Sequence, residues 1–223
     1  FLSLLMFFPY RDDNPRVLYP YVNFGIIGLN IIIFLSQYLI IGNDYHLNQK
    51  FIFSYGFIPA NFNLPTIFTS MFMHGGFIHI LGNMWFLYLF GDNVESLLGH
   101  VKYFIFYLFC GTSAAIIQFF IDPNSQIPMV GASGAIAGVL GAYMIRFPKA
   151  RVHVLAVIVV FFTTIIVPAQ IVLGLWFLMQ LSNGLSSLGV NTNGGVAWFA
   201  HIGGFIAGIT TFGYIQKFRF EKV

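Results

Sequence analysis

The sequence predicts an all-α integral membrane protein with six membrane-spanning helices, and three observations support this fold class. Of the 223 residues, 58% are hydrophobic and only 8% are charged, and the mean hydropathy is +0.82. A chain of this composition cannot hide its apolar surface in one soluble core. Long apolar runs recur along the chain, and six spans place almost all Lys and Arg residues on one side.

Six apolar runs are expected to form the membrane helices: residues 22–41, 77–90, 103–121, 133–147, 169–188 and 198–214. A seventh run, residues 152–166, would reach only about 22 Å as a helix, against a hydrocarbon core of about 30 Å. If it does not span, both chain ends are cytoplasmic and Lys50 is the single Lys or Arg outside. We therefore predict a membrane-surface or re-entrant segment on the cytoplasmic side for residues 152–166.

This topology divides the chain into three parts. Residues 1–20 are expected to form an N-terminal interfacial segment rather than a signal peptide, since no small-residue cleavage site follows the apolar start. Residues 21–216 form the six-helix domain, and residues 217–223 form a basic cytoplasmic tail. The net charge of +3 is spread too thinly for a nucleic-acid surface, so the expected partners are the lipid bilayer and other membrane proteins. The lone Cys110 excludes an internal disulfide.

Five polar side chains are predicted to lie at one depth near the outer side of the membrane. His79 and Asn83 are four residues apart on one helical face, and His74 precedes them. Ser133 begins the fourth run, and His201 lies about one turn into the sixth. Taken singly, each is an ordinary hydrogen-bonded structural group, and a membrane serine usually bonds back to its own helix. Their shared depth instead favours a functional site.

Serine chemistry explains this grouping. A serine attacks a carbonyl group only if a base within hydrogen-bond reach takes its proton, and His201 is the available base. Small residues would let the fourth and sixth helices approach closely, namely Gly134, Gly138, Gly141, Gly204 and Gly208. The N-terminus of the helix at Ser133, together with His79 and Asn83, could stabilise a developing oxyanion.

The chain resembles the rhomboid family of intramembrane serine proteases in "HGGFIHILGN", "GASGAIAG" and "AHIGGFIAG", which occur in the family's order. Flanking stretches such as "RDDNP", "YGFIPA", "FGDNVESLLGH" and "VLGLWFLMQL" extend the resemblance over nearly the whole chain. The resemblance implies a six-helix rhomboid bundle with a catalytic cavity open to the outer side. It also implies a nucleophile, a general base, three residues that stabilise the oxyanion or substrate and a structural neighbour: Ser133, His201, Asn83, His79, Gly131 and His74.

Two departures from the family pattern are visible. Many relatives carry a Trp-Arg pair in the first outer loop, where this chain has "NLPTIF". Some relatives place a tyrosine four residues after the serine, where this chain has Ala137, so another group must hold the His201 ring. No carboxylate is an obvious third member, and a Ser-His dyad without metal or cofactor is therefore expected.

Other functions remain as alternatives. A zinc hydrolase could use His74, His79 and His201, but the chain lacks HExxH and this site would leave the G-x-S-G sequence unexplained. A soluble-type hydrolase elbow would need glycine where Ala135 stands. A transporter would show paired interrupted helices. An inactive rhomboid relative would be expected to lack Ser133 or His201.

The resulting prediction is an intramembrane serine endopeptidase, in a prokaryotic plasma membrane, that cleaves membrane proteins in or near their transmembrane segments. Substrates are expected to enter between the second and fifth spans. The Gly-, Asn- and Ser-rich stretch of residues 182–195 is expected to act as a mobile lid.

Single cysteines test the predicted topology in a Cys110→Ala background. Lys149→Cys and Lys222→Cys should react with a membrane-impermeant maleimide from the same side, and Lys50→Cys from the opposite side, because six spans return the chain to its starting side. Labelling of Lys222→Cys from the Lys50 side would instead mean an odd number of spans.

Overall fold

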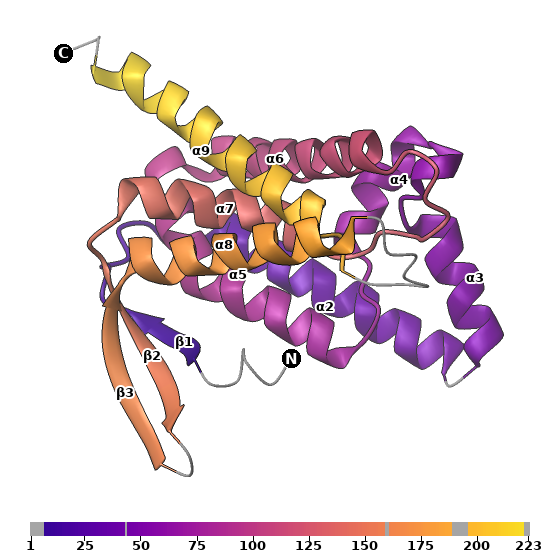
Figure 1. The fold of residues 1–223 in the computed structure, drawn as a ribbon, viewed down its shortest axis with the longest axis horizontal. Helices are drawn as coiled ribbons and strands as arrows, with labels where there is room; N and C mark the ends of the chain where they lie inside the picture. The colour runs from indigo at the N-terminus through magenta and orange to yellow at the C-terminus, as the bar shows by residue number, and fades with distance from the viewer. Residues whose placement is uncertain (1–6, 43, 159–160, 189–195, 221–223) are drawn as a thin grey trace.

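The computed structural model describes residues 7–42, 44–158, 161–188 and 196–220, and it is mostly helical (Figure 1). Each of the six predicted apolar runs forms a helix, and the six lie side by side as a bundle. They are α2 (Tyr21–Ile41), α5 (Phe77–Leu98), α6 (His100–Ile121), α7 (Ser133–Arg146), α8 (Ala169–Ser187) and α9 (Trp198–Phe220). Because α9 runs to Phe220, the predicted basic tail of residues 217–223 begins as part of this helix.

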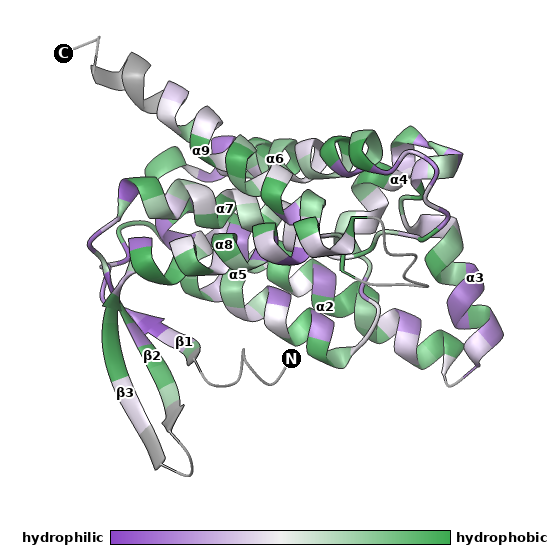
Figure 2. Cartoon of the chain, in the orientation of Figure 1, coloured by the Kyte–Doolittle hydropathy of each residue, from purple (hydrophilic) through white to green (hydrophobic). Residues whose placement is uncertain are grey.

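The bundle has an apolar exterior suited to a membrane. Among the described residues, α2 and α6 are by length and composition able to cross a bilayer, and Leu64–Phe72 with α5 makes a third candidate that is bent by 87°. Hydrophobic residues predominate along α2 and α6 in Figure 2. That all six helices span the membrane stays a prediction. The 14 residues of α7, for example, reach only about 21 Å as a helix, less than the hydrocarbon core of about 30 Å.

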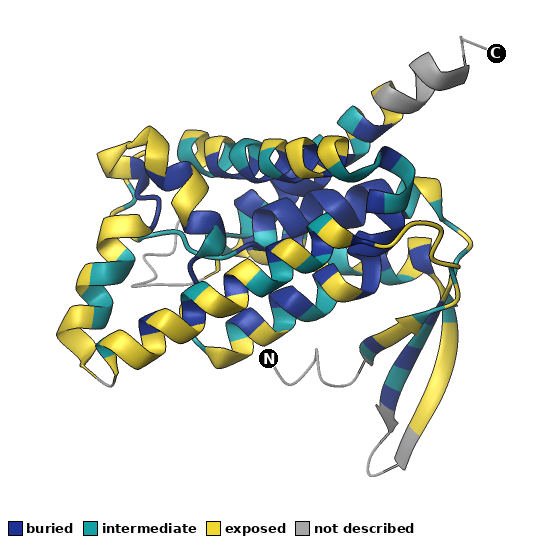
Figure 3. Cartoon of the chain, turned by 180° about the vertical axis from the view of Figure 1, so that it is seen from behind, coloured by how far each residue is buried: buried dark blue, intermediate teal, exposed yellow. Residues whose placement is uncertain are grey.

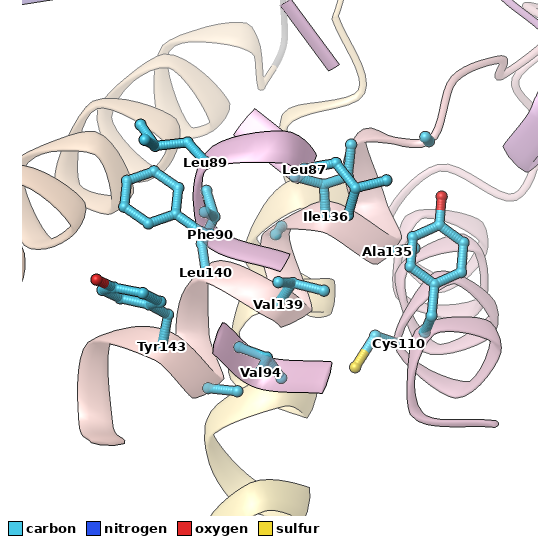
Figure 4. Close-up of a cluster of buried hydrophobic side chains, with 14 of the residues drawn as sticks. Leu87, Leu89, Phe90, Val94, Cys110, Ala135, Ile136, Val139, Leu140 and Tyr143 are labelled. Carbon is cyan, nitrogen blue, oxygen red and sulfur yellow. The ribbon is translucent and has the colours of Figure 1, made fainter. Parts of the chain in front are cut away.

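Helix α7 lies at the centre of the bundle. Every residue from Gly134 to Tyr143 is buried, and the helix packs against α5, α6 and α9 (Figure 3). This stretch is apolar on all sides, which is typical of a helix enclosed by others. Figure 4 shows side chains of α7, such as Ile136 and Leu140, packed against Leu87 and Phe90 of α5 and beside Cys110 of α6.

Short helices fill the connection between α2 and α5 at the end of the bundle that carries the predicted site. They are α3 (Tyr45–Tyr55), η1 (Pro59–Asn61), α4 (Leu64–Thr69) and η2 (Ser70–Phe72). The Asp44 side chain caps α3 by accepting a hydrogen bond from the Leu47 N–H at 3.0 Å. A backbone bridge between Phe57 and Met129 joins this region to the segment before α7.

The all-α prediction is wrong for the opposite end, where the chain forms a three-stranded antiparallel sheet (Figure 1). The strands are β1 (Phe7–Asp12), β2 (Arg151–Ile158) and β3 (Phe161–Pro168), in the order β1-β2-β3. Residues 152–166 therefore form most of a β-hairpin, whose residues 159–160 lie outside the described part. The position of this hairpin at the membrane surface stays a prediction. Val152, Val154 and Ala156 are buried on alternate positions, the period of a strand with one covered face.

The physical reason for the hairpin lies in composition and in a distant partner. Residues 152–166 are rich in Val, Ile, Thr and Phe, which favour strands. The other edge of β2 pairs with β1, with Val154 opposite Pro9 and Leu155 opposite Phe8. This pairing gives part of the predicted interfacial segment, residues 7–12, a defined strand structure.

Buried carboxylates connect the helices at the sheet end. Glu95 of α5 is fully buried and accepts hydrogen bonds from the N–H groups of Val22 (3.0 Å) and Asn23 (2.7 Å) at the start of α2. Two N–H groups that lack partners within the helix are thereby satisfied, and the negative charge sits at the positive end of the α2 dipole. Asp92 pairs with Arg16 at 3.0 Å.

A second contact ties the N-terminal strand to the central helix. The Tyr143 hydroxyl of α7 donates a hydrogen bond to the Asp12 carboxylate of β1, and the Asn14 amide donates to the Tyr143 oxygen at 2.9 Å. Burial raises the pKa of Asp12 to about 6, and the nearby carboxylate of Asp92 acts in the same direction. The folded protein therefore binds a proton at Asp12 more tightly than the unfolded chain does.

The raised pKa of Asp12 predicts how stability depends on pH. Between pH 7 and pH 5 the folded state takes up a proton at Asp12 that the unfolded state does not. The cost of burying a charged Asp12 is thereby removed, so the free energy of unfolding rises as the pH falls. The Asp12→Asn variant should lose this gain while keeping an oxygen that can accept from Tyr143. Thermal unfolding in detergent at both pH values measures the difference. Asp122→Asn, at an exposed carboxylate directly after α6, is the control and should keep the gain.

Candidate functional site

The site begins at Ser133, the first residue of α7. Gly131, two residues before Ser133, has φ +122°, a left-handed conformation that favours glycine. Its N–H donates to the Ser70 carbonyl at 2.9 Å. The chain can therefore turn sharply into the helix. The first N–H groups of α7 have no carbonyl partner within the helix. The cap residue Ala132 has no polar side chain that could accept from them.

Ser133 contacts His201 of α9. The distance between Ser133 Oγ and His201 Nε2 is 2.8 Å, the length of a good hydrogen bond. Both residues are intermediate between buried and exposed. A serine and a base in this geometry can act as a nucleophile and its proton acceptor.

Glycines allow this contact by bringing the backbones of α7 and α9 together. A Cβ atom on Gly204 would overlap the Gly134 carbonyl oxygen, and one on Gly208 would overlap the Gly138 carbonyl oxygen. On the far side of α7, a Cβ on Gly138 would overlap Cys110 of α6. Ser133 directly precedes the Gly134 contact and His201 lies one turn before Gly204, so the two side chains face each other at the end of this seam.

Asn83 and His79 of α5 converge on the backbone just before Ser133. A Cβ atom on Gly131 would lie 2.7 Å from His79 Nε2 and 3.5 Å from Asn83 Nδ2. The Asn83 amide nitrogen is buried and has no hydrogen-bond partner among the described residues. A buried donor without an acceptor is costly, so this amide is poised to donate to a group that enters the site. Since the Gly131 N–H is occupied, Gly131 contributes space rather than a donor.

His74 lies beside His79. Among the described residues it makes no hydrogen bond or ring contact with Ser133 or His201. It is fully buried, its ring centroid lies 5.1 Å from that of His79, and neither ring nitrogen has a hydrogen-bond partner among the described residues. His74 also lines a cavity between α2, α3 and the start of α5, together with Gln37 and Asn48. Within the described residues, no three His, Cys, Asp or Glu side chains form a metal-ligand group.

Gln180 of α8 is a further residue at the site, and it is not among those predicted from the sequence. Its Oε1 lies 2.8 Å from His201 Nδ1, the nitrogen that faces away from Ser133. Trp176, one turn earlier on α8, places its ring 6.0 Å from the His201 ring. The signal in the sequence is a single amide in the apolar run "VLGLWFLMQL", but only the packing of α8 on α9 shows what it contacts.

The predicted lid overlaps a helix. Residues 182–187 belong to α8, which ends at Ser187, and residues 189–195 lie outside the described part of the chain. The cavity open to the outer side stays a prediction, supported by the partial exposure of Ser133, His79 and His201.

Comparison with known proteins matches residues 61–217 to the Rhomboid domain. Rhomboid protein 1, mitochondrial, of Saccharomyces cerevisiae is 25% identical over 94% of this chain and 56% of its own length. Rhomboid-like protein 11, chloroplastic, of Arabidopsis thaliana is 32% identical over 52% of this chain and 38% of its own. A rhomboid protein of Bacillus subtilis is 30% identical over 57% of this chain and 62% of its own.

The chain thus spans about four-tenths to six-tenths of the length of these relatives. The mitochondrial and chloroplastic names among them mean that a prokaryotic plasma membrane stays a prediction for this chain.

The contact between Ser133 and His201 predicts an unusually reactive serine. A fluorophosphonate probe should label the wild-type protein in detergent, and Ser133→Ala should abolish the labelling because the attacking oxygen is gone. The Ser186→Ala variant is the matched control, since the Ser186 hydroxyl donates back to the Ser182 carbonyl of its own helix at 2.8 Å. Labelling that persists in Ser133→Ala and disappears in Ser186→Ala would contradict the site.

Proposed function

This chain belongs to the rhomboid family, and on that premise we propose that it is a serine endopeptidase that cleaves membrane proteins in or near their transmembrane segments. The observation that carries the proposal is the 2.8 Å contact between Ser133 Oγ and His201 Nε2, made between two helices whose backbones touch. An intramembrane serine that bonded only to its own helix would be a packing residue. A serine that faces a histidine on another helix is equipped for nucleophilic attack.

In the proposed reaction, His201 Nε2 takes the proton of Ser133 while Oγ attacks the carbonyl carbon of the substrate peptide. The oxyanion that forms is stabilised by the buried Asn83 amide, by His79 and by the N–H groups at the start of α7. His201 then gives its proton to the leaving amine, which leaves an acyl-enzyme. Water, activated by His201 in the same way, releases the second product.

The arrangement of α5 and α8 supports a substrate that arrives sideways from the lipid. Among the described residues, helix α8 packs mainly against α9 and α7. Both helices have exposed faces with apolar side chains, among them Phe77 and Leu81 on α5 and Leu175 and Leu178 on α8. An apolar substrate helix would be compatible with these faces, and it would have to unwind to expose a carbonyl group to Ser133.

Proteolysis in liposomes tests the proposed function. A single-span membrane protein with Ala near the outer end of its span, flanked by Gly or Pro, should be cut by the wild type. Ser133→Ala and His201→Ala should abolish cleavage. Asn83→Ala should lower kcat by about 10²-fold, the usual loss of one oxyanion donor.

The control is Asn30→Ala, because the buried Asn30 amide bonds to the Ile26 carbonyl of its own helix at 2.8 Å and lies outside the site. Its kcat should stay near the wild-type value. Full activity in Ser133→Ala would overturn the proposed function, whatever the effect of Asn83→Ala.

A further inference from the structure

We propose that Gln180 is a positioning residue that holds His201 in the tautomer required for attack by Ser133. This inference rests on the proposed function, in which His201 acts as the general base. A neutral imidazole carries its hydrogen on only one of two nitrogens, and only the nitrogen without hydrogen can accept a proton. The environment of Nδ1 therefore decides whether Nε2 can serve Ser133.

The geometry places Gln180 at the nitrogen that matters. Gln180 is 6% exposed, and its Oε1 lies 2.8 Å from His201 Nδ1. Ser133 Oγ lies at the same distance from Nε2, on the other side of the ring. The imidazole thus bridges a side chain of α8 and a side chain of α7.

The orientation of the Gln180 amide follows from its second contact. Gln180 Nε2 donates to the Trp176 carbonyl at 3.4 Å, and a carbonyl oxygen can only accept. The NH₂ group must therefore point to Trp176 and the amide oxygen to His201. Because that oxygen is also only an acceptor, His201 Nδ1 must carry the hydrogen, and Nε2 is left free to take the proton of Ser133.

Helix α8 also supports the ring from the side. The Trp176 ring lies 6.0 Å from the His201 ring at an angle of 33°, and the Trp198 ring lies 6.2 Å away at 89°. Trp176 and Gln180 are four residues apart and share one face of α8. Ala137 of α7 is buried and too small to stack on the imidazole. Orientation of the base therefore comes from α8 and α9.

A neutral amide suits this environment. When His201 takes the serine proton it becomes a cation, and the Gln180 oxygen then accepts a stronger, charge-assisted hydrogen bond. A carboxylate in this place would add a buried charge that needs its own partners in the resting enzyme. Since Gln180 belongs to α8, the base is oriented only while α8 is seated against α9.

Two substitutions separate positioning from simple packing. Gln180→Met keeps the side-chain length but removes the acceptor, so kcat should fall by about tenfold, the effect of one neutral hydrogen bond, with KM within about twofold. Gln180→Glu keeps an acceptor and should recover most of kcat. Its negative charge favours the charged form of His201, so activity should be lost at a pH about one unit higher on the acid side. His79, the other titratable group near His201, is unchanged in both variants.

Gln118→Met is the matched control. Gln118 of α6 also bonds to α9, accepting from the Ala200 N–H at 3.2 Å, but it does not touch the His201 ring. Its loss should leave the acid side of the pH profile in place. All variants are measured by cleavage in liposomes, and their melting temperatures in detergent establish that they fold.

The outcomes distinguish the two levels of the proposal. Wild-type kcat in Gln180→Met, or equal losses in both Gln180 variants with an unshifted pH profile, would overturn the positioning role. If Gln180→Met does not fold, the profile of Gln180→Glu decides alone. Loss of cleavage in Ser133→Ala alongside normal Gln180 variants would leave the proposed function intact, whereas cleavage by Ser133→Ala would overturn both.

Discussion

The contact between the backbones of α7 and α9 is the constraint on which the rest of the site depends. Between membrane helices there is little hydrophobic driving force, so close packing of small residues must hold them together. Glycines at 134, 138, 204 and 208 leave no room for a Cβ atom at this seam. A larger residue would push the helices apart, and the hydrogen bond between Ser133 and His201 would be lost with them.

Neighbouring elements hold α7 in place along its middle and at both ends. Its middle is enclosed by α5, α6 and α9, which fixes the position of the helix. At the sheet end, Tyr143 bonds to Asp12 of β1. At the other end, Gly131 turns the chain so that Ser133 begins the helix, whose first N–H groups have no partner within the helix. A reactive group held on a rigid, buried helix keeps its geometry better than one held on a loop.

The buried polar side chains of this apolar bundle differ in whether they have hydrogen-bond partners. Glu95, Asn23 and Tyr103 satisfy one another and nearby backbone groups, which is the usual condition of buried polar side chains. The Asn83 amide nitrogen, beside the backbone that leads to Ser133, and the His74 ring, beside His79, have no such partners among the described residues. The unpaired Asn83 donor destabilises the fold, and a bound substrate that accepts its hydrogen bond could offset this cost. The paired side chains at the sheet end have a structural role.

The sequence by itself determined what depends on local pattern. Apolar runs predicted six helices close to their observed starts, although α5 and α9 extend several residues past the predicted ends. The motifs around His79, Asn83, Ser133 and His201 suggested one site, because helical periodicity and short motifs are local properties. Only the tertiary structure decided the rest. Strand β2 needs a partner that lies about 140 residues earlier in the chain, and Gln180 acquires its role only where α8 packs on α9. Pairing between distant segments leaves no periodic signal in either segment, so it had to be seen in three dimensions.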